Sequence, residues 1–315
     1  MAALDSGAQV SVSNLSGLFK EVYADKLQDL VPQFEILAGD VPFVRQPKLG
    51  DSYHFPIRVK RAHGVTFNSD GSAFELNSAI AGVTVDASVQ GTEFVIRERV
   101  SYGAASRAIG SRDAFESTFN AVVLDMTNSS SFYREALCLY GQSDIGTVST
   151  ATSVNATTVN FVISQASWAP GLWAQMEGAK IDLYNSAGGT KQNGSDLTIN
   201  SVNMTTRTLS VQRATADTTE TNAAAGEVLT PKGDFASSTF NVYAGLDRIT
   251  TNTTSLFGVS AATYGIWQAN THGAGTAALT MAKVCGAAAE AAVRSEMGKR
   301  ICYVSTASWT DLMRS

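Results

Sequence analysis

The sequence predicts an α+β fold in which one long helix separates a β-hairpin from a larger all-β region. Apolar residues alternate with a period of two between Phe55 and Val100, which is typical of paired strands. They recur at helical spacing from 113 to 140. From 142 to 243 helix formers are scarce and Thr, Ser, Asn and Gly are abundant, so we expect a separate β insertion there.

The first two elements are a short helix and the hairpin. Apolar spacing over 15–37 predicts an amphipathic helix that ends at Pro32. Alternating residues over 55–59 lead into the hairpin, and those over 83–96 lead out of it. The middle, 63–77, is rich in Gly, Asn, Ser and Asp, which predicts a loose tip. Because an isolated hairpin is marginally stable in water, we expect this one to lie on another surface, such as a neighbouring subunit.

The strongest helix signal runs from Asp113 to Gly141. Asp113 and Glu116 have the spacing of a capping box, and Gly141 is a typical helix stop. A helix of this length measures about 40 Å, which suits an architectural spine. The residues that we expect to form its core face are Phe115, Phe119, Val122, Met126 and Leu137.

The β insertion is predicted from short alternating runs, among them 159–163, 180–184 and 208–211. Glycine-containing turn signals separate these runs. We expect Trp168, Leu172 and Trp173, near the start of the insertion, to belong to its core.

The C-terminal region again has the residue pattern of α-helices. An Ala-rich pattern over 276–297 predicts a helix closed by Gly298, 300–305 reads as a buried strand, and 308–313 reads as the start of another helix. Cys285 and Cys302 are then small core residues. The chain has 3 cysteines, an odd number, which argues against a disulfide framework and fits a reducing compartment.

The charge content is low. Charged residues make up 16% of the 315 residues, against roughly 25% in an ordinary domain. This predicts either a hydroxyl-rich β surface or extensive interfaces with partners. The net charge of −5 argues against a protein whose main function is to bind nucleic acid. No apolar run is long enough for a membrane span and no signal segment is evident, so we expect a cytoplasmic protein with no membrane partner.

A scan for catalytic motifs finds none of the phosphate-binding, dinucleotide-binding, zinc or nucleophile-elbow patterns. The 3 histidines, His54, His63 and His272, are scattered, and we interpret each as an ordinary strand or loop residue. The sequence therefore predicts no enzyme activity, no catalytic residue, no cofactor and no metal site.

Basic residues gather in and after the hairpin. Arg58, Lys60 and Arg61 form one cluster, and Arg97 and Arg99 form a second. They are candidate inter-subunit contacts that meet phosphates or acidic side chains of a neighbour. The solvated face of a strand explains the same pattern equally well, and the sequence leaves both interpretations open.

The order of these parts resembles the major capsid protein of tailed bacteriophages, of the Hong Kong 97 type. The residues that support the likeness lie mainly near the C-terminus: Gly245–Ile249, Leu256–Val259, Tyr264, Trp267, Leu279-Thr280, Val304-Ser305, Trp309 and Leu312. In addition, Trp173–Ile181 resembles the entry to a β insertion found in some members.

The resemblance implies a domain plan. An N-terminal arm covers 1–54, an extended loop 55–100, a peripheral domain with the spine helix 101–141, the β insertion 142–243 and an axial domain 244–315. Family members normally continue past the Trp309 helix with strands that complete the axial and peripheral sheets, and the chain departs from this pattern. It also lacks a scaffolding-type N-terminal extension, so any scaffold is a separate protein or already removed.

The resemblance also implies a function, namely self-assembly as hexamers and pentamers into an icosahedral shell around packaged double-stranded DNA. The chain would assemble in the host cytoplasm, reside in the virion and touch the DNA only by non-specific proximity. Separate scaffolding, portal and decoration proteins would be its other partners. Two alternatives remain: a β-rich tail, surface-adhesion or decoration protein, and a nanocompartment shell protein of the same fold.

Overall fold

The computed structural model describes residues 36–40, 52–73, 76–99, 118–214, 225–236, 239–273, 275, 278–294 and 301–314. It confirms a mixed α and β fold that contains a six-stranded barrel. The chain divides into two compact units, 1–32 with 96–130, and 33–95 with 131–315. The predicted helix over 15–37 falls largely outside the described residues, as do the Asp113 and Glu116 cap and Phe115. Within the described part of the chain, no helix is long and apolar enough to cross a membrane.

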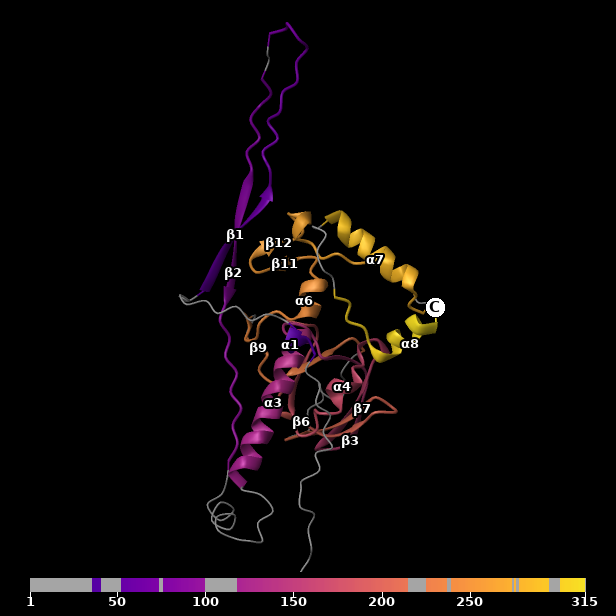
Figure 1. Cartoon of the computed structure of the whole chain (residues 1–315). Helices are drawn as coiled ribbons and strands as arrows, with labels where there is room; N and C mark the ends of the chain where they lie inside the picture. The colour runs from indigo at the N-terminus through magenta and orange to yellow at the C-terminus, as the bar shows by residue number, and fades with distance from the viewer. Residues whose placement is uncertain are drawn as a thin grey trace, which may run out of the picture. The chain divides into compact units, whose positions relative to one another are not determined.

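The hairpin is formed by β1 (Ser52–Lys60) and β2 (Val83–Gln90), which run side by side in Figure 1. They pair antiparallel from Ser52 opposite Gln90 to Arg58 opposite Thr84, with an irregularity before Lys60. The predicted pairing of two alternating strands is therefore confirmed. The predicted extension of the second strand towards Val100 is wrong. The strand ends at Gln90, which pairs with Ser52, the first residue of β1.

The spine helix is α3 (Thr118–Tyr140), followed at once by the barrel. The barrel order is β3-β4-β7-β6-β5-β8, and all its pairs are antiparallel. Its strands are β3 (Gly146–Asn155), β4 (Thr158–Ile163), β5 (Lys180–Tyr184), β6 (Leu197–Asn203), β7 (Thr208–Arg213) and β8 (Val228–Pro231). Closure leaves the sheet without an open edge for another chain to pair with.

The barrel core is filled by its own side chains. The largest of those fully buried include Trp173, Phe161, Ile163, Ile181, Leu183, Leu197, Ile199, Leu209 and Leu229. Trp173 lies on the short helix α4 (Pro170–Trp173), which follows a 3₁₀ turn, η1 (Gln165–Ser167). Trp168 stacks on Trp173 with ring centroids 6.1 Å apart. The core role predicted for Trp168, Leu172 and Trp173 is confirmed.

The end of α3 belongs to the same core, because Ala136 is buried with the barrel residues and Phe132 and Tyr140 pack against them. The chain enters the barrel after Gly141 and returns at Gly245, whose N–H donates to the Gly141 carbonyl oxygen (2.7 Å). A Cβ atom on either glycine would lie 2.7 Å from the Leu137 carbonyl oxygen. Only glycine permits this close crossing of two backbone segments.

Between the barrel and the C-terminal helices, the described residues form short elements. They are β9 (Phe235–Ala236), β10 (Thr239–Phe240), α6 (Leu246–Thr250), β11 (Ser255–Leu256), β12 (Val259–Ser260) and the 3₁₀ turn η2 (Gly265–Trp267). The predicted C-terminal helices are confirmed as α7 (Met281–Arg294) and α8 (Thr306–Arg314). None of the described side chains between 262 and 314 is buried.

Two predictions for this region are wrong, the buried strand and the core role of the two cysteines. Residues 301–305 form no strand, and Ile301 and Tyr303 are exposed, since no described strand lies beside them to complete a ladder. Cys285 and Cys302 are likewise exposed and therefore not core residues. The charged residues of α7, Lys283, Glu290 and Arg294, lie on one side of the helix, and none of the side chains on its opposite, apolar side is buried, which leaves Cys285 exposed.

Candidate assembly surface

The lower part of the hairpin, which we call the stalk, is β1 paired with β2, and its two faces differ. On the apolar face Tyr53, Phe55 and Ile57 lie opposite Val89, Ala87 and Val85, and Ala87 is fully buried. This face is covered in part by the turn between β11 and β12. The Phe257 ring meets Phe55 at 6.4 Å, and the Ser88 N–H donates to the Phe257 carbonyl oxygen (3.0 Å).

The covering turn has unusual backbone geometry. Phe257 and Gly258 have φ angles of 54° and 80°, the combination that a two-residue type I′ hairpin turn requires. Glycine tolerates positive φ, whereas a bulky residue such as phenylalanine adopts it at a cost. The contact with Phe55 compensates Phe257 for that cost and fixes the turn against the stalk.

On the opposite, polar face of the stalk, three side chains form a hydrogen-bonded chain. Ser52 Oγ lies 2.6 Å from His54 Nε2, and Asp86 Oδ2 lies 2.6 Å from His54 Nδ1. His54 and Asp86 are about half exposed, at 55% and 59%. This cluster was not predicted from the sequence, because Asp86 is distant along the chain from His54 and only the strand register brings the two together.

The upper part of the hairpin, residues 61–82, we call the tip. Asn77 bridges its two arms by donating to Thr66 Oγ1 from the backbone (2.9 Å) and to the Val65 carbonyl oxygen from the side chain (3.0 Å). Asn68 donates to the carbonyl oxygens of Ser72 (2.9 Å) and Ala73 (2.8 Å). The tip predicted to be loose is thus cross-linked by amide side chains.

The tip exposes large apolar side chains. Phe67 is 91% exposed and Leu76 is 82% exposed, and Val65 and Ile80 are each more than half exposed. The barrel, by contrast, buries nearly all its large apolar residues. An exposed apolar cluster on a soluble protein marks an interaction surface or an aggregation hazard.

The predicted basic contacts lie at several places. Arg58 and Arg61 are exposed on the hairpin, whereas Lys60 has a partner in its own chain: its Nζ lies 6.0 Å from the Tyr264 ring centroid. That distance is the outer limit of a cation–π contact. Arg97 and Arg99 are exposed and belong to the other compact unit.

The predicted core face of α3 is described in part. Leu137 is buried, and Val122 and Met126 are half-buried. Phe119 lies within the helix, and its side chain falls outside the described residues.

Glu135 of α3 holds the N-terminal helix α1 (Leu37–Asp40). Its carboxylate accepts the backbone N–H groups of Ile36 (3.3 Å), Leu37 (2.9 Å) and Ala38 (2.7 Å). The Tyr303 hydroxyl donates to Asp40 from the C-terminal side (3.2 Å). Glu135 therefore caps a helix from another element and ties the N-terminal segment to the spine.

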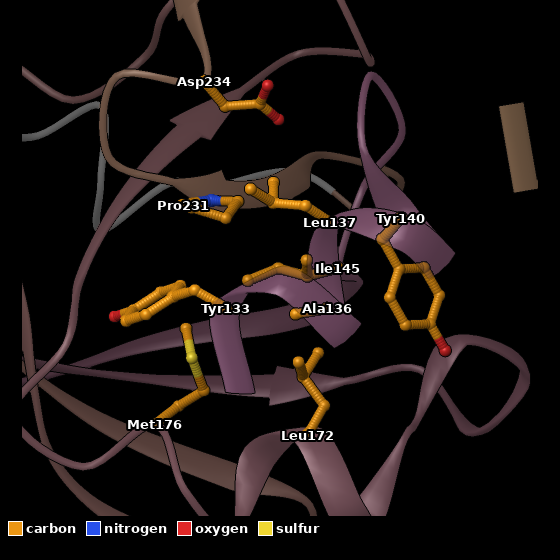
Figure 2. A pocket seen from close by; sticks show the side chains of 9 residues that line it. All are labelled: Tyr133, Ala136, Leu137, Tyr140, Ile145, Leu172, Met176, Pro231 and Asp234. Carbon is orange, nitrogen blue, oxygen red and sulfur yellow. The ribbon is translucent and has the colours of Figure 1, made fainter. Parts of the chain in front are cut away.

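A buried carboxyl lies where α3 meets the barrel. Figure 2 shows Asp234 beside Pro231 and Leu137, at one end of a small cavity of about 10 Å³ lined mainly by apolar side chains. Asp234 is only 3% exposed, and its Oδ1 accepts no hydrogen bond from any described residue. Burial raises the pKa of Asp234 from 3.8 to about 7.

Comparisons of this chain with family models, with curated proteins and with solved structures found no match. Among the described residues, no three His, Cys, Asp or Glu side chains gather where they could hold a metal ion.

Proposed function

We propose that this chain is a structural shell protein, of the kind that the resemblance to Hong Kong 97-type major capsid proteins implies. Many copies assemble into a closed shell, in the full proposal as hexamers and pentamers around packaged double-stranded DNA. The observation that supports assembly is the hairpin tip, where Phe67 and Leu76 stand almost fully exposed.

The energetics favour covering the tip. Complete burial of a Val, Leu, Ile or Phe side chain gains about 1.5–3 kcal/mol. The four large apolar residues that the structure shows exposed in the tip therefore gain at most about 6–12 kcal/mol on a partner, before the cost of lost freedom on association. Repeated between many copies of the chain, a contact of this strength would stabilise an assembly.

A closed shell requires a second, different contact. One head-to-tail interface generates a ring or a filament, and another must join the rings. The C-terminal helices offer such a surface, since Val293 on α7 and Trp309 and Met313 on α8 are more than half exposed. Figure 1 shows both helices at the yellow end of the chain. Their apolar residues supply the second interface in this proposal.

The barrel supports the proposal in a different way. Its closed sheet and filled core satisfy its own backbone and apolar groups, so it needs no neighbour to be stable. This suits an insertion carried on a shell subunit whose assembly contacts lie elsewhere.

The experiment compares assembly of the wild-type chain with that of the double variant Phe67→Ser, Leu76→Ser, by light scattering and negative-stain microscopy. Val154→Ser is the matched control, because Val154 on β3 is 56% exposed, the same value as Ile80 in the tip. We expect shells from the wild type and the control, and smaller species from the double variant with unchanged circular dichroism. A wild-type chain that stays monomeric at every concentration and ionic strength overturns the proposal.

A further inference from the structure

The polar face of the hairpin stalk combines three residue types in a specific connectivity. Ser52 Oγ contacts His54 Nε2 and Asp86 contacts His54 Nδ1, each at 2.6 Å. A serine, an imidazole and a carboxylate joined in this order are the parts of a base-activated nucleophile. We propose that Ser52 is a nucleophile for acyl transfer from small esters or thioesters, with His54 as its general base and Asp86 as a positioning residue.

The strand backbone explains why these groups stay together. Ser52 and His54 are two residues apart on β1, so they share a face. The register places Asp86 opposite Pro56, which makes it the diagonal neighbour of His54 on that face. Three fixed backbone positions therefore set the geometry, and the Ser88 to Phe257 hydrogen bond anchors this part of β2 to the β11–β12 turn.

Each group has a defined task. The carboxylate of Asp86 accepts the N–H of His54 Nδ1, which leaves the lone pair of Nε2 directed to the Ser52 hydroxyl. The hydroxyl proton then passes to Nε2 as the serine oxygen attacks. General-base assistance of this kind accelerates such a step by about 10²–10⁴-fold.

The reaction balances without an added oxidant or metal. Ser52 Oγ forms a bond to the carbonyl carbon while its proton moves to His54 Nε2. The bond from that carbon to the leaving oxygen or sulfur breaks, and the leaving group takes the proton from His54. Water, deprotonated by His54, then cleaves the acyl-serine ester and releases the carboxylic acid and free Ser52.

The surroundings restrict the substrate class. His54 and Asp86 are about half exposed, so the donor arrives from solvent and needs an intrinsically reactive acyl group. Gln90 lies directly opposite Ser52 on the same face, where its side-chain amide is the register neighbour suited to stabilise the developing oxyanion. This inference is independent of shell assembly, because Ser52, His54 and Asp86 all belong to one hairpin.

The experiment treats the full chain with a fluorophosphonate probe, which traps activated serines, and locates the adduct by peptide mass spectrometry. Ser88 is the internal control, since it lies on the same face opposite His54 without a contact to its imidazole nitrogens. We expect one adduct, on Ser52, formed about 10²-fold faster than any adduct on Ser88.

Variants then separate catalysis from structure. Ser52→Ala should abolish labelling, and His54→Ala should slow it about 10²-fold while circular dichroism stays unchanged. Asp86→Asn should slow it as well, and Asp86→Glu should restore part of the rate, which a purely structural role in strand pairing would not produce. No adduct on Ser52, or an adduct formed equally fast in the His54→Ala variant, overturns the proposal.

Discussion

Asp234 provides the sharpest test of the packing between α3 and the barrel. Its carboxyl is buried among apolar side chains, and burial raises its pKa from 3.8 to about 7. A displacement of this size corresponds to about 4 kcal/mol between the two protonation states. The folded state therefore binds the proton more tightly than the unfolded chain, in which Asp234 titrates near its ordinary value.

The sign of the pH dependence follows from that difference. The stabilising contribution of Asp234 is complete below about pH 4 and is lost as the pH rises through about 7, because ionisation then places a charge in the apolar site. Between these limits the free energy of unfolding falls by up to about 1.4 kcal/mol per pH unit. Asp234→Asn removes the ionisation, so the variant should be more stable than the wild type above pH 7.

The assay is urea unfolding at pH 5 to 8, followed by the fluorescence of the stacked pair Trp168 and Trp173 in the barrel core. The difference in the free energy of unfolding between the wild type and Asp234→Asn isolates the contribution of Asp234 from that of other carboxyls. One of these is Asp144, because burial raises its pKa as well. Asp196→Asn is the control. Lys180 and Lys232 lower the pKa of Asp196 to about 2, so its replacement should shift stability equally at every pH in this range. Parallel curves for the wild type and Asp234→Asn would refute the reasoning.

Two further substitutions test the connections of the spine helix. Glu135→Ala removes the acceptor of three backbone N–H groups and should weaken the docking of α1 by about 2 kcal/mol, seen as faster hydrogen exchange at Leu37 and Ala38; unchanged exchange would contradict this. Gly245→Ala places a Cβ atom 2.5 Å from the Gly141 nitrogen and should cost about 1–3 kcal/mol in urea unfolding. The control Gly265→Ala meets nothing within 4 Å and should change stability little; equal effects of the two would disprove the crowding argument.

Hydrophobic periodicity predicted the hairpin and the strands of the β insertion, though not the closure of those strands into a barrel, because both regions satisfy their ladders within the chain. In β4 the alternation of Val159, Phe161 and Ile163 points one face into the core, and each of these residues is fully buried. The same type of pattern failed over 301–305, where no described strand provides the partner that turns alternation into a ladder. Hydrophobic periodicity indicates which residues of a strand can share a face. Whether that face is buried depends on the element that pairs with the strand or packs on it.

The candidate sites depended on information that the sequence holds only indirectly. Pairing of His54 with Asp86 depends on the register of β1 and β2. A shift of that register by one residue would place Asp86 on the opposite face from His54. The capping of α1 by Glu135 joins residues nearly a hundred positions apart and has no local signature. Exposure of Phe67 was also unforeseen, because an apolar residue in a Gly- and Asn-rich segment reads equally well as a buried anchor.

The low charge content of the chain has two physical explanations, one for the barrel and one for the exposed apolar surfaces. The barrel surface needs few charges, because Thr, Ser and Asn hydroxyls and amides cover it and its closed sheet offers no edge to a partner. The hairpin tip also has few charges, and its exposed positions hold Phe67 and Leu76; the C-terminal helices have their share of charges and still expose Trp309. Solubility alone would favour charged residues at such positions. Their replacement by apolar residues is explained if these surfaces are covered, and in the proposed shell other copies of the same chain cover them.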